Sequence, residues 1–307
     1  MRLAIARLLS AAVVVLGVSA AVFLLVHLVP GDPIDALLGE AAANADRGAL
    51  RQALGLDAPL AVQWWRFVSA AATGDLGTSL GTGRPVAALL AERLPYTAAL
   101  ALAALAVALA IAFPLGTLAA LRAGGVLDAL AGMASMLGAA LPNFLLGPIF
   151  IIVFALWLGW FPIGGAEGPR AIVLPALTLG SGLAALLARM IRAALLEVLA
   201  EEHVRAARAR GLGPLAILRH HVFPPAALPI LTVVGAQLGA LLGGAVITET
   251  VFGWPGLGQL AVEAIQRRDY PLVQGTVLVI SVSYVVLNTL VDLLYARLDP
   301  RLENDAG

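Results

Sequence analysis

Long stretches without a charged side chain are the feature that most limits how this chain can fold. No Asp, Glu, Lys or Arg interrupts the sequence between Arg93 and Arg122, or between Asp128 and Glu167. A helix needs about 20 apolar residues to cross the hydrocarbon core of a bilayer, and both stretches exceed that length. Because 61% of all residues are hydrophobic and only 12% are charged, we predict an all-α integral membrane protein.

Six segments are apolar enough to be predicted as membrane-spanning helices: Leu8–Val29, Thr97–Leu121, Ala129–Leu158, Ala171–Ala188, Ala226–Thr248 and Leu272–Val291. The third is longer than one crossing requires. Because proline removes a helical hydrogen bond, we expect it to be tilted or broken around Leu141–Phe144 and Gly147–Pro148. The first is longer than the apolar region of a signal peptide, and Pro30–Pro33 is a poor cleavage site, so we interpret it as a retained span.

The positions of the arginines predict the orientation of these spans. With the N-terminus inside, the short cytoplasmic segments hold most arginines, so we predict that both termini are cytoplasmic. Arg189 and Arg192 follow the fourth span and are expected to extend toward lipid headgroups. The predicted domains are an N-terminal helix (1–30), an external region (31–95), a five-helix core (96–301) and a cytoplasmic tail (302–307). The external region includes an amphipathic, interfacial segment around Arg51–Phe67.

The amino-acid composition excludes several functions. The chain has no cysteine and no lysine, since all 19 basic residues are arginine. A Walker A loop needs a lysine on the phosphates, so we predict that this chain is not an enzyme and hydrolyses no ATP. With no cysteine and four scattered histidines, we predict no metal site, and no catalytic constellation of side chains stands out. A net charge of zero predicts no nucleic-acid-binding surface.

The longest internal polar segment, about residues 196–224, lies between the fourth and fifth predicted spans. Glu201–Arg210 consists of good helix formers, and Gly211 occupies a helix C-cap position. Gly213–Pro214 predicts a turn, and Leu215–His221 a second short helix. Such a helix–turn–helix along the inner membrane surface is typical of a docking site. From the residues alone, an arginine-rich helix that only fixes topology and binds anionic lipid is equally compatible.

This segment resembles the coupling motif of the permease subunits of ATP-binding-cassette (ABC) importers. The resemblance rests on Arg205–Ala207, on Gly211 four residues later and on His221–Pro224. The basic residue at the first position resembles the dipeptide/oligopeptide/nickel branch of that family. Three further stretches resemble the same branch: His27–Pro33, Glu249–Gly258 and Asp292–Arg301. The sequence departs from the pattern at Pro225, where the branch usually has Asn, and at His221 and Phe223, which replace Ile and Leu.

The resemblance implies a permease that forms half of a translocation pathway for di- or oligopeptides or similar small solutes. Nickel chelates or other small molecules are the alternatives within the family. The partners that it implies are a second homologous permease, two cytoplasmic ATPase subunits that carry ATP and Mg, an external substrate-binding protein and membrane lipid. It also implies location in the bacterial cytoplasmic membrane and no cofactor in this chain. The implied ATPase-coupling residues are Arg205, Ala206, Ala207, Arg208, Arg210, Gly211, Leu212 and Pro224.

A second group of candidate residues follows the fifth predicted span at its outer end. Glu249, Trp254, Pro255 and Gly256 are expected to form an external gate or to contact the binding protein, or to be structural only. The alternative function is a self-sufficient secondary transporter or channel. Such proteins normally show inverted repeats or charged residues inside their spans. The uncharged runs of this chain therefore favour the permease.

Overall fold

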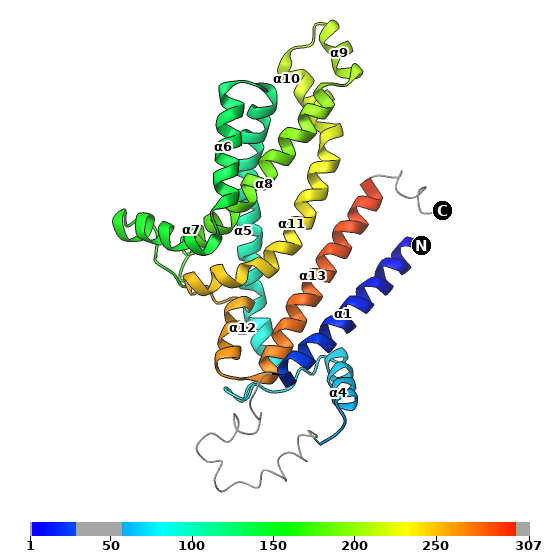
Figure 1. The fold of residues 1–307 in the computed structure, drawn as a ribbon, viewed down its shortest axis with the longest axis vertical. Coiled ribbons are helices and arrows are strands. Elements are labelled where there is room, and N and C mark those ends of the chain that lie inside the picture. The colour runs from blue at the N-terminus through cyan, green and yellow to red at the C-terminus, as the bar shows by residue number, and fades with distance from the viewer. Residues whose placement is uncertain (1, 29–56, 299–307) are drawn as a thin grey trace. The chain divides into compact units, whose positions relative to one another are not determined.

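A computed structural model describes residues 2–28 and 57–298 of the chain. They fall into two compact units. Unit 1 comprises Met1–Thr97 and Pro255–Val286, and unit 2 comprises Ala98–Trp254 and Leu287–Gly307. The described residues form helices and no strand, apart from one isolated bridge between Thr78 and Pro85 (Figure 1). The predicted all-helical fold is therefore confirmed.

The described helices follow one another along the chain. They are α1 (Arg2–Leu28), α4 (Leu60–Ala72), α5 (Val86–Leu121), α6 (Val126–Ala140), α7 (Asn143–Phe150), the π-helical η2 (Ile151–Trp157), α8 (Val173–Leu199), α9 (Glu202–Ala209), α10 (Pro214–Ile217), the π-helical η3 (Leu218–Val222), α11 (Phe223–Phe252), α12 (Leu257–Gln266) and α13 (Tyr270–Leu298). Residues 29–56 and 299–307, which include part of the predicted external region (31–95) and all of the predicted tail (302–307), lie outside the described part of the chain.

Three described helices are long and apolar enough to cross a membrane: Val86–Leu121, Pro214–Gly243 and Tyr270–Val291. A fourth candidate is the pair Val126–Gly138 and Asn143–Trp157, whose two halves meet at 98°. The multi-pass prediction is confirmed, whereas the count of six spans and the cytoplasmic position of both termini stay predictions.

The bend between α6 and α7 lies where the sequence predicts a break. Leu141 adopts an extended conformation (ψ 117°), because the ring of Pro142 disfavours a helical conformation in the residue before it. The chain then starts a new helix at Asn143. The predicted third span is therefore two helices at a steep angle rather than one tilted rod.

In unit 2 the central helix is α8, which packs against α6, α7 and α11 and is largely buried. Glycines also bring it close to α5. A Cβ atom on Gly180 of α8 would lie 2.7 Å from the carbonyl oxygen of Ala104, and one on Gly116 of α5 would lie 2.7 Å from that of Ala188. These two contacts show that α5 and α8 run in the same direction. Small residues at a helix interface are typical of packing in membranes.

Unit 1 has a separate apolar core, which α5, α12 and α13 share. Its buried members include Val86, Leu257 and Leu272. Gly275 of α13 allows a close approach, because a Cβ atom there would lie 2.6 Å from Val86. The backbone N–H of Leu257, at the start of α12, donates a hydrogen bond to the buried Thr97 hydroxyl (2.8 Å).

The external amphipathic segment predicted around Arg51–Phe67 is helical from Leu60 onward, as α4. The Trp64 indole N–H donates to the Ser19 hydroxyl of α1 (3.2 Å), whereas Trp65 is 63% exposed. One tryptophan thus joins α4 to α1, and the other remains available to a membrane interface.

Four helices end at a residue in the left-handed conformation, with the same two backbone hydrogen bonds. The residues are Gly74 after α4 (φ 86°), Gly211 after α9 (φ 79°), Gly253 after α11 (φ 58°) and Arg268 after α12 (φ 53°). In each case the N–H groups of this residue and the next bond to carbonyls of the last helical turn. Glycine adopts this conformation freely, whereas a residue with a Cβ atom loses about 1–2 kcal/mol.

Candidate functional site

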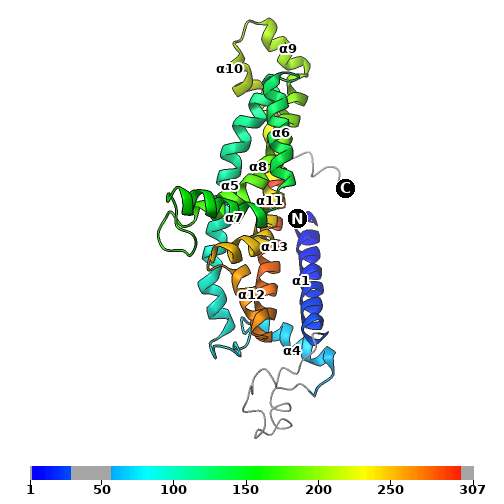
Figure 2. The ribbon, with the colours of Figure 1, turned by 60° about the vertical axis from the view of Figure 1, so that its left-hand side comes forward.

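The candidate coupling residues lie on a hairpin, residues 201–224, between α8 and α11 in unit 2. Figure 2 shows α9 and α10 at one end of the unit 2 helices. The loop predicted for residues 196–224 starts later than expected, because α8 continues to Leu199 and the chain leaves it at Ala200.

Helix α9 has one buried and one exposed side. Val204 and Ala207, one turn apart, are fully buried in the same apolar cluster as residues of α10 and η3. Arg205, Ala206 and Arg208 are exposed. The two alanines of the motif therefore differ: Ala207 anchors the hairpin to the body of unit 2, and Ala206 faces outward.

The turn after α9 depends on Gly211, as the sequence predicts. Its N–H donates to the carbonyl of Arg208 (2.9 Å), and the N–H of Leu212 donates to that of Ala207 (3.3 Å). A Cβ atom on Gly211 would meet nothing within 4 Å. Glycine is therefore required for its left-handed backbone and not for space.

The expected second short helix, Leu215–His221, is not separate. Helix α10 passes directly into η3, and η3 into α11. The prolines Pro224 and Pro225 do not stop the helix, because proline is tolerated in a first helical turn. The wider π-helical turn of η3 precedes them. The hairpin is therefore one short helix connected to the first turns of a long one.

A side chain completes the hydrogen bonding at this junction. Pro225 has no N–H to donate to the carbonyl of His221, four residues earlier. The Nε2 atom of His203 lies 2.9 Å from that carbonyl oxygen, so the imidazole supplies the missing donor. Its other nitrogen, Nδ1, lies 2.9 Å from a carboxylate oxygen of Glu201. His203 thus joins α9 to η3. The sequence had given this histidine no role beyond the prediction that the four histidines form no metal site.

The arginines of the hairpin differ in their contacts. Arg205 donates to the carbonyl of Ala200 (3.0 Å) and Arg210 to that of Ala206 (3.3 Å), so both satisfy carbonyls near helix ends. For Arg208 no hydrogen bond or ion pair is found within residues 2–28 and 57–298. The exposed side of α9 therefore presents positive charge among small side chains.

The second candidate group lies where α11 ends and α12 begins. The side chain of Glu249 is fully buried and that of Trp254 is 5% exposed. The carbonyl of Phe252 accepts a hydrogen bond from the N–H of Gly165 (2.8 Å), and a Cβ atom on Gly164 would lie 2.3 Å from it. The loop that precedes α8 thus packs on the end of α11. In the sequence, the adjacent glycines Gly164 and Gly165 are the one feature of this loop compatible with such a close approach. Within unit 1, Pro255 and Gly256 precede α12, and Gly256 caps it.

Known families match almost the whole chain. The family described as "Binding-protein-dependent transport system inner membrane component" matches residues 112–304. A second description, "Binding-prot-dependent transport system membrane comp, N-term", matches residues 1–101.

The glutathione transport system permease protein GsiC is similar along nearly its full length. The protein from Escherichia coli O6:H1 is 40% identical over 285 residues, covering 93% of this chain and 93% of the relative. The protein from Pectobacterium atrosepticum is 40% identical over 298 residues, covering 97% of each.

Solved structures of ABC transporters share the fold. A chain of an inward-facing MetNI methionine transporter aligns with a TM-score of 0.57 at 24% identity, covering 68% of this chain and 94% of that one. An amino acid ABC transporter crystallised with histidines aligns with a TM-score of 0.52 at 19% identity, covering 69% and 94%. The chain therefore belongs to the binding-protein-dependent transport system inner membrane component family, as the multi-pass plasma-membrane permease subunit of an ABC importer.

Proposed function

We propose that the chain forms half of the translocation pathway of its importer and couples it to a cytoplasmic ATPase through α9. The observation that carries this proposal is the division of α9 into two sides. Val204 and Ala207 fix the helix to unit 2, while Arg205, Ala206 and Arg208 are exposed for a partner. A small alanine between two arginines lets a partner backbone approach closely and offers charge to its acidic groups.

The connection to α11 supports a mechanical role for the hairpin. Because α10 passes through η3 directly into α11, a displacement of the hairpin is transmitted to a membrane-spanning helix. ATP and Mg belong to two partner ATPases, since this chain has no lysine for a Walker A loop. A second homologous permease and an external binding protein complete the importer.

We propose short peptides as the cargo, with glutathione as the first candidate. Two relatives at 40% identity are named for glutathione transport. Glutathione is a tripeptide, so it falls within the di- and oligopeptide class that the sequence resemblance implies. Nickel chelates are the alternative cargo to be tested alongside it.

For Glu249, Trp254, Pro255 and Gly256 we propose a role in an external gate. The burial of the Glu249 and Trp254 side chains favours this role over direct contact with the binding protein, because a buried side chain offers no surface to a partner.

Reconstitution of the complete importer in proteoliposomes tests the function. The permease pair, the ATPases and the binding protein are combined, and the uptake of labelled glutathione, a dipeptide and a nickel chelate is measured with and without ATP. We expect uptake of glutathione or dipeptide that requires ATP and the binding protein. Uptake by this chain alone without ATP would replace the proposal with a secondary transporter, and uptake of the nickel chelate alone would replace the peptide cargo.

Matched alanine substitutions test the coupling site. Ala206→Arg places a large side chain on the exposed side of α9, and we expect ATP-dependent uptake to fall roughly tenfold or more at normal membrane levels. Ala193→Arg, at an exposed alanine of α8, is the control and should keep most activity. Ala207→Arg must instead disrupt the packing of the hairpin, because Ala207 is fully buried. Normal uptake by Ala206→Arg would exclude the exposed side of α9 as the docking surface.

A further inference from the structure

A buried carboxylate organises the corner between α12 and α13 in unit 1. Asp269 is 2% exposed. One of its oxygens accepts hydrogen bonds from the Ser79 hydroxyl (2.5 Å) and from the Gly81 N–H (3.1 Å). The other accepts from the N–H of Leu272 in the first turn of α13 (3.3 Å). Asp269 therefore fixes a loop almost 190 residues earlier in the chain to this corner.

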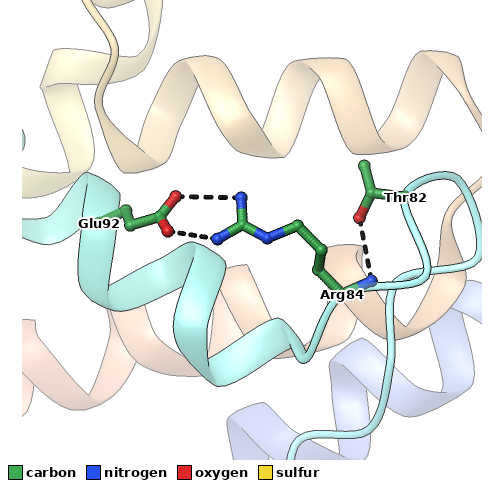
Figure 3. Close-up of polar contacts among 3 residues, drawn as sticks. All are labelled: Thr82, Arg84 and Glu92. Carbon is green, nitrogen blue, oxygen red and sulfur yellow. Dashed lines mark hydrogen bonds and ion pairs between the residues drawn. The ribbon is translucent and has the colours of Figure 1, made fainter.

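The loop that Asp269 holds has further internal hydrogen bonds. The Ser79 hydroxyl accepts from the N–H of Thr82 (3.1 Å), and the Thr82 hydroxyl accepts from the N–H of Arg84 (3.4 Å). The Arg84 guanidinium donates to both carboxylate oxygens of Glu92 (Figure 3). That hydrogen bonding raises the pKa of Arg84 above its usual value. The loop thus has a fixed shape, and the charge of Arg84 is already paired.

Arg268, immediately before Asp269, is the one non-glycine residue with a positive φ angle among the described residues. Its N–H bonds to the carbonyl of Ile265 (3.1 Å) and that of Asp269 to the carbonyl of Ala264 (2.9 Å). Gly253 closes α11 with the same pair of bonds. Arginine therefore occupies a position where glycine would be unstrained, and strain retained in this way is associated with function.

Two adjacent arginines are exposed on this fixed backbone. The side chains of Arg267 and Arg268 are both exposed. The Cδ atom of Arg267 lies 4.0 Å from the Cβ position of Gly81, so its aliphatic stem lies along the loop. Within residues 2–28 and 57–298 neither guanidinium has a hydrogen bond or ion pair, because the neighbouring Asp269 carboxylate is used inside the corner.

We infer that Arg267 and Arg268 form a docking point for acidic side chains of the external binding protein. This inference rests on the proposed function. The corner joins the last two predicted spans on the predicted external side, and the family is dependent on a binding protein. A rigid backbone that presents two unpaired guanidiniums suits recognition of carboxylates, because little conformational entropy is lost on binding.

Substitutions of Arg268 separate charge from backbone strain. Arg268→Gly removes both, Arg268→Ala removes only the charge, and Arg268→Lys keeps both. In the reconstituted importer we measure the thermal midpoint and the concentration of binding protein that gives half-maximal ATPase stimulation. We expect Arg268→Gly to raise the midpoint by roughly 2–4 °C and to raise the half-maximal concentration roughly fivefold. Arg268→Ala should raise that concentration equally without the gain in stability, and Arg268→Lys, which keeps the charge but not the planar guanidinium, should raise it less than Arg268→Ala does.

A control variant and three possible outcomes separate a failure of the docking point from a failure of the proposed function. Arg170→Ala removes an exposed arginine of unit 2 and should leave the half-maximal concentration unchanged. If all Arg268 variants respond to the binding protein as the wild type does, the docking point is excluded while the proposed function stands. If the wild type itself is not stimulated by any binding protein, the proposed function fails. An equal loss of basal ATPase activity without the binding protein would assign Arg268 to lipid contact or structure instead.

Discussion

The Arg192 guanidinium of α8 donates two parallel hydrogen bonds to the Asp128 carboxylate of α6. The Nε and Nη2 atoms lie 2.5 and 2.7 Å from the two carboxylate oxygens. The same carboxylate accepts from the N–H of Gly124, which precedes α6 (2.9 Å). Asp128 thus ties α6 and the turn before it to α8. Arg192 was expected to extend toward lipid headgroups, and its pairing with Asp128 corrects that expectation.

Breaking this pair should destabilise unit 2. Because the side chain of Asp128 is only 12% exposed and accepts both hydrogen bonds from Arg192, Asp128→Asn is expected to lower the free energy of unfolding measurably. Arg192→Gln should have a similar effect, and the double variant should lose less than the sum of the two. Thermal unfolding of the detergent-solubilised chain measures this. Arg189→Gln, one turn away and without an ion pair among the described residues, is the control, and additive losses in the double variant would contradict the coupling.

The close contact of α5 and α8 predicts opposite results for two helical glycines. A Cβ atom on Gly180 would lie 2.7 Å from the backbone oxygen of Ala104, which cannot move without its helix. Gly180→Ala should therefore lower the thermal midpoint. A Cβ atom on Gly243 of α11 would meet nothing within 4 Å. Gly243→Ala should be neutral or stabilising by up to about 1 kcal/mol, because alanine is the better helix former. Equal stability of the two variants would show that α5 and α8 do not pack this closely.

The sequence predicted those features that depend on local physics. Uncharged runs indicated the membrane helices, Pro142 indicated the break after α6, and Gly211 indicated the end of α9. Each of these follows from the chemistry of a residue and its near neighbours. The stretches that resemble known permeases also indicated the family correctly.

The sequence could not predict pairings between distant segments. Nothing near Asp128 points to Arg192, and nothing near Asp269 points to Ser79, because such bonds depend on how the helices pack. The same holds for the two sides of α9, where the burial of Ala207 and the exposure of Ala206 depend on the position of η3. No local feature of the sequence distinguishes the π-helical turn of η3 from the separate second helix that was predicted there.

The proposed external gate leads to a prediction for Glu249. Glu249→Gln keeps the size of this fully buried side chain and removes its charge. If the carboxylate acts in gating, uptake should fall at least severalfold while membrane levels and thermal midpoint stay near those of the wild type. A loss of stability in proportion to the loss of uptake would indicate a structural role instead. Trp254→Ala should mainly destabilise, by about 3–5 kcal/mol, because the ring is buried in the core of unit 2.

The hydrogen bond between His203 and the carbonyl of His221 predicts a rescue. His203→Ala removes the imidazole donor to this carbonyl, and the hairpin should lose about 1 kcal/mol of stability. Pro225→Ala restores a backbone N–H four residues after His221, so the double variant should regain most of the loss. Limited proteolysis of the hairpin and ATP-dependent uptake measure the effect.

The control for this rescue is Glu201→Ala, which removes the partner of the other imidazole nitrogen but keeps the bond to His221. Because that carboxylate is 53% exposed, its loss should change stability by less than about 1 kcal/mol. Pro225→Ala should not compensate for it, since the restored N–H acts only on the carbonyl of His221. Compensation of both variants by Pro225→Ala would mean that the alanine stabilises the start of α11 in general, and His203 would then have no specific part in joining α9 to η3.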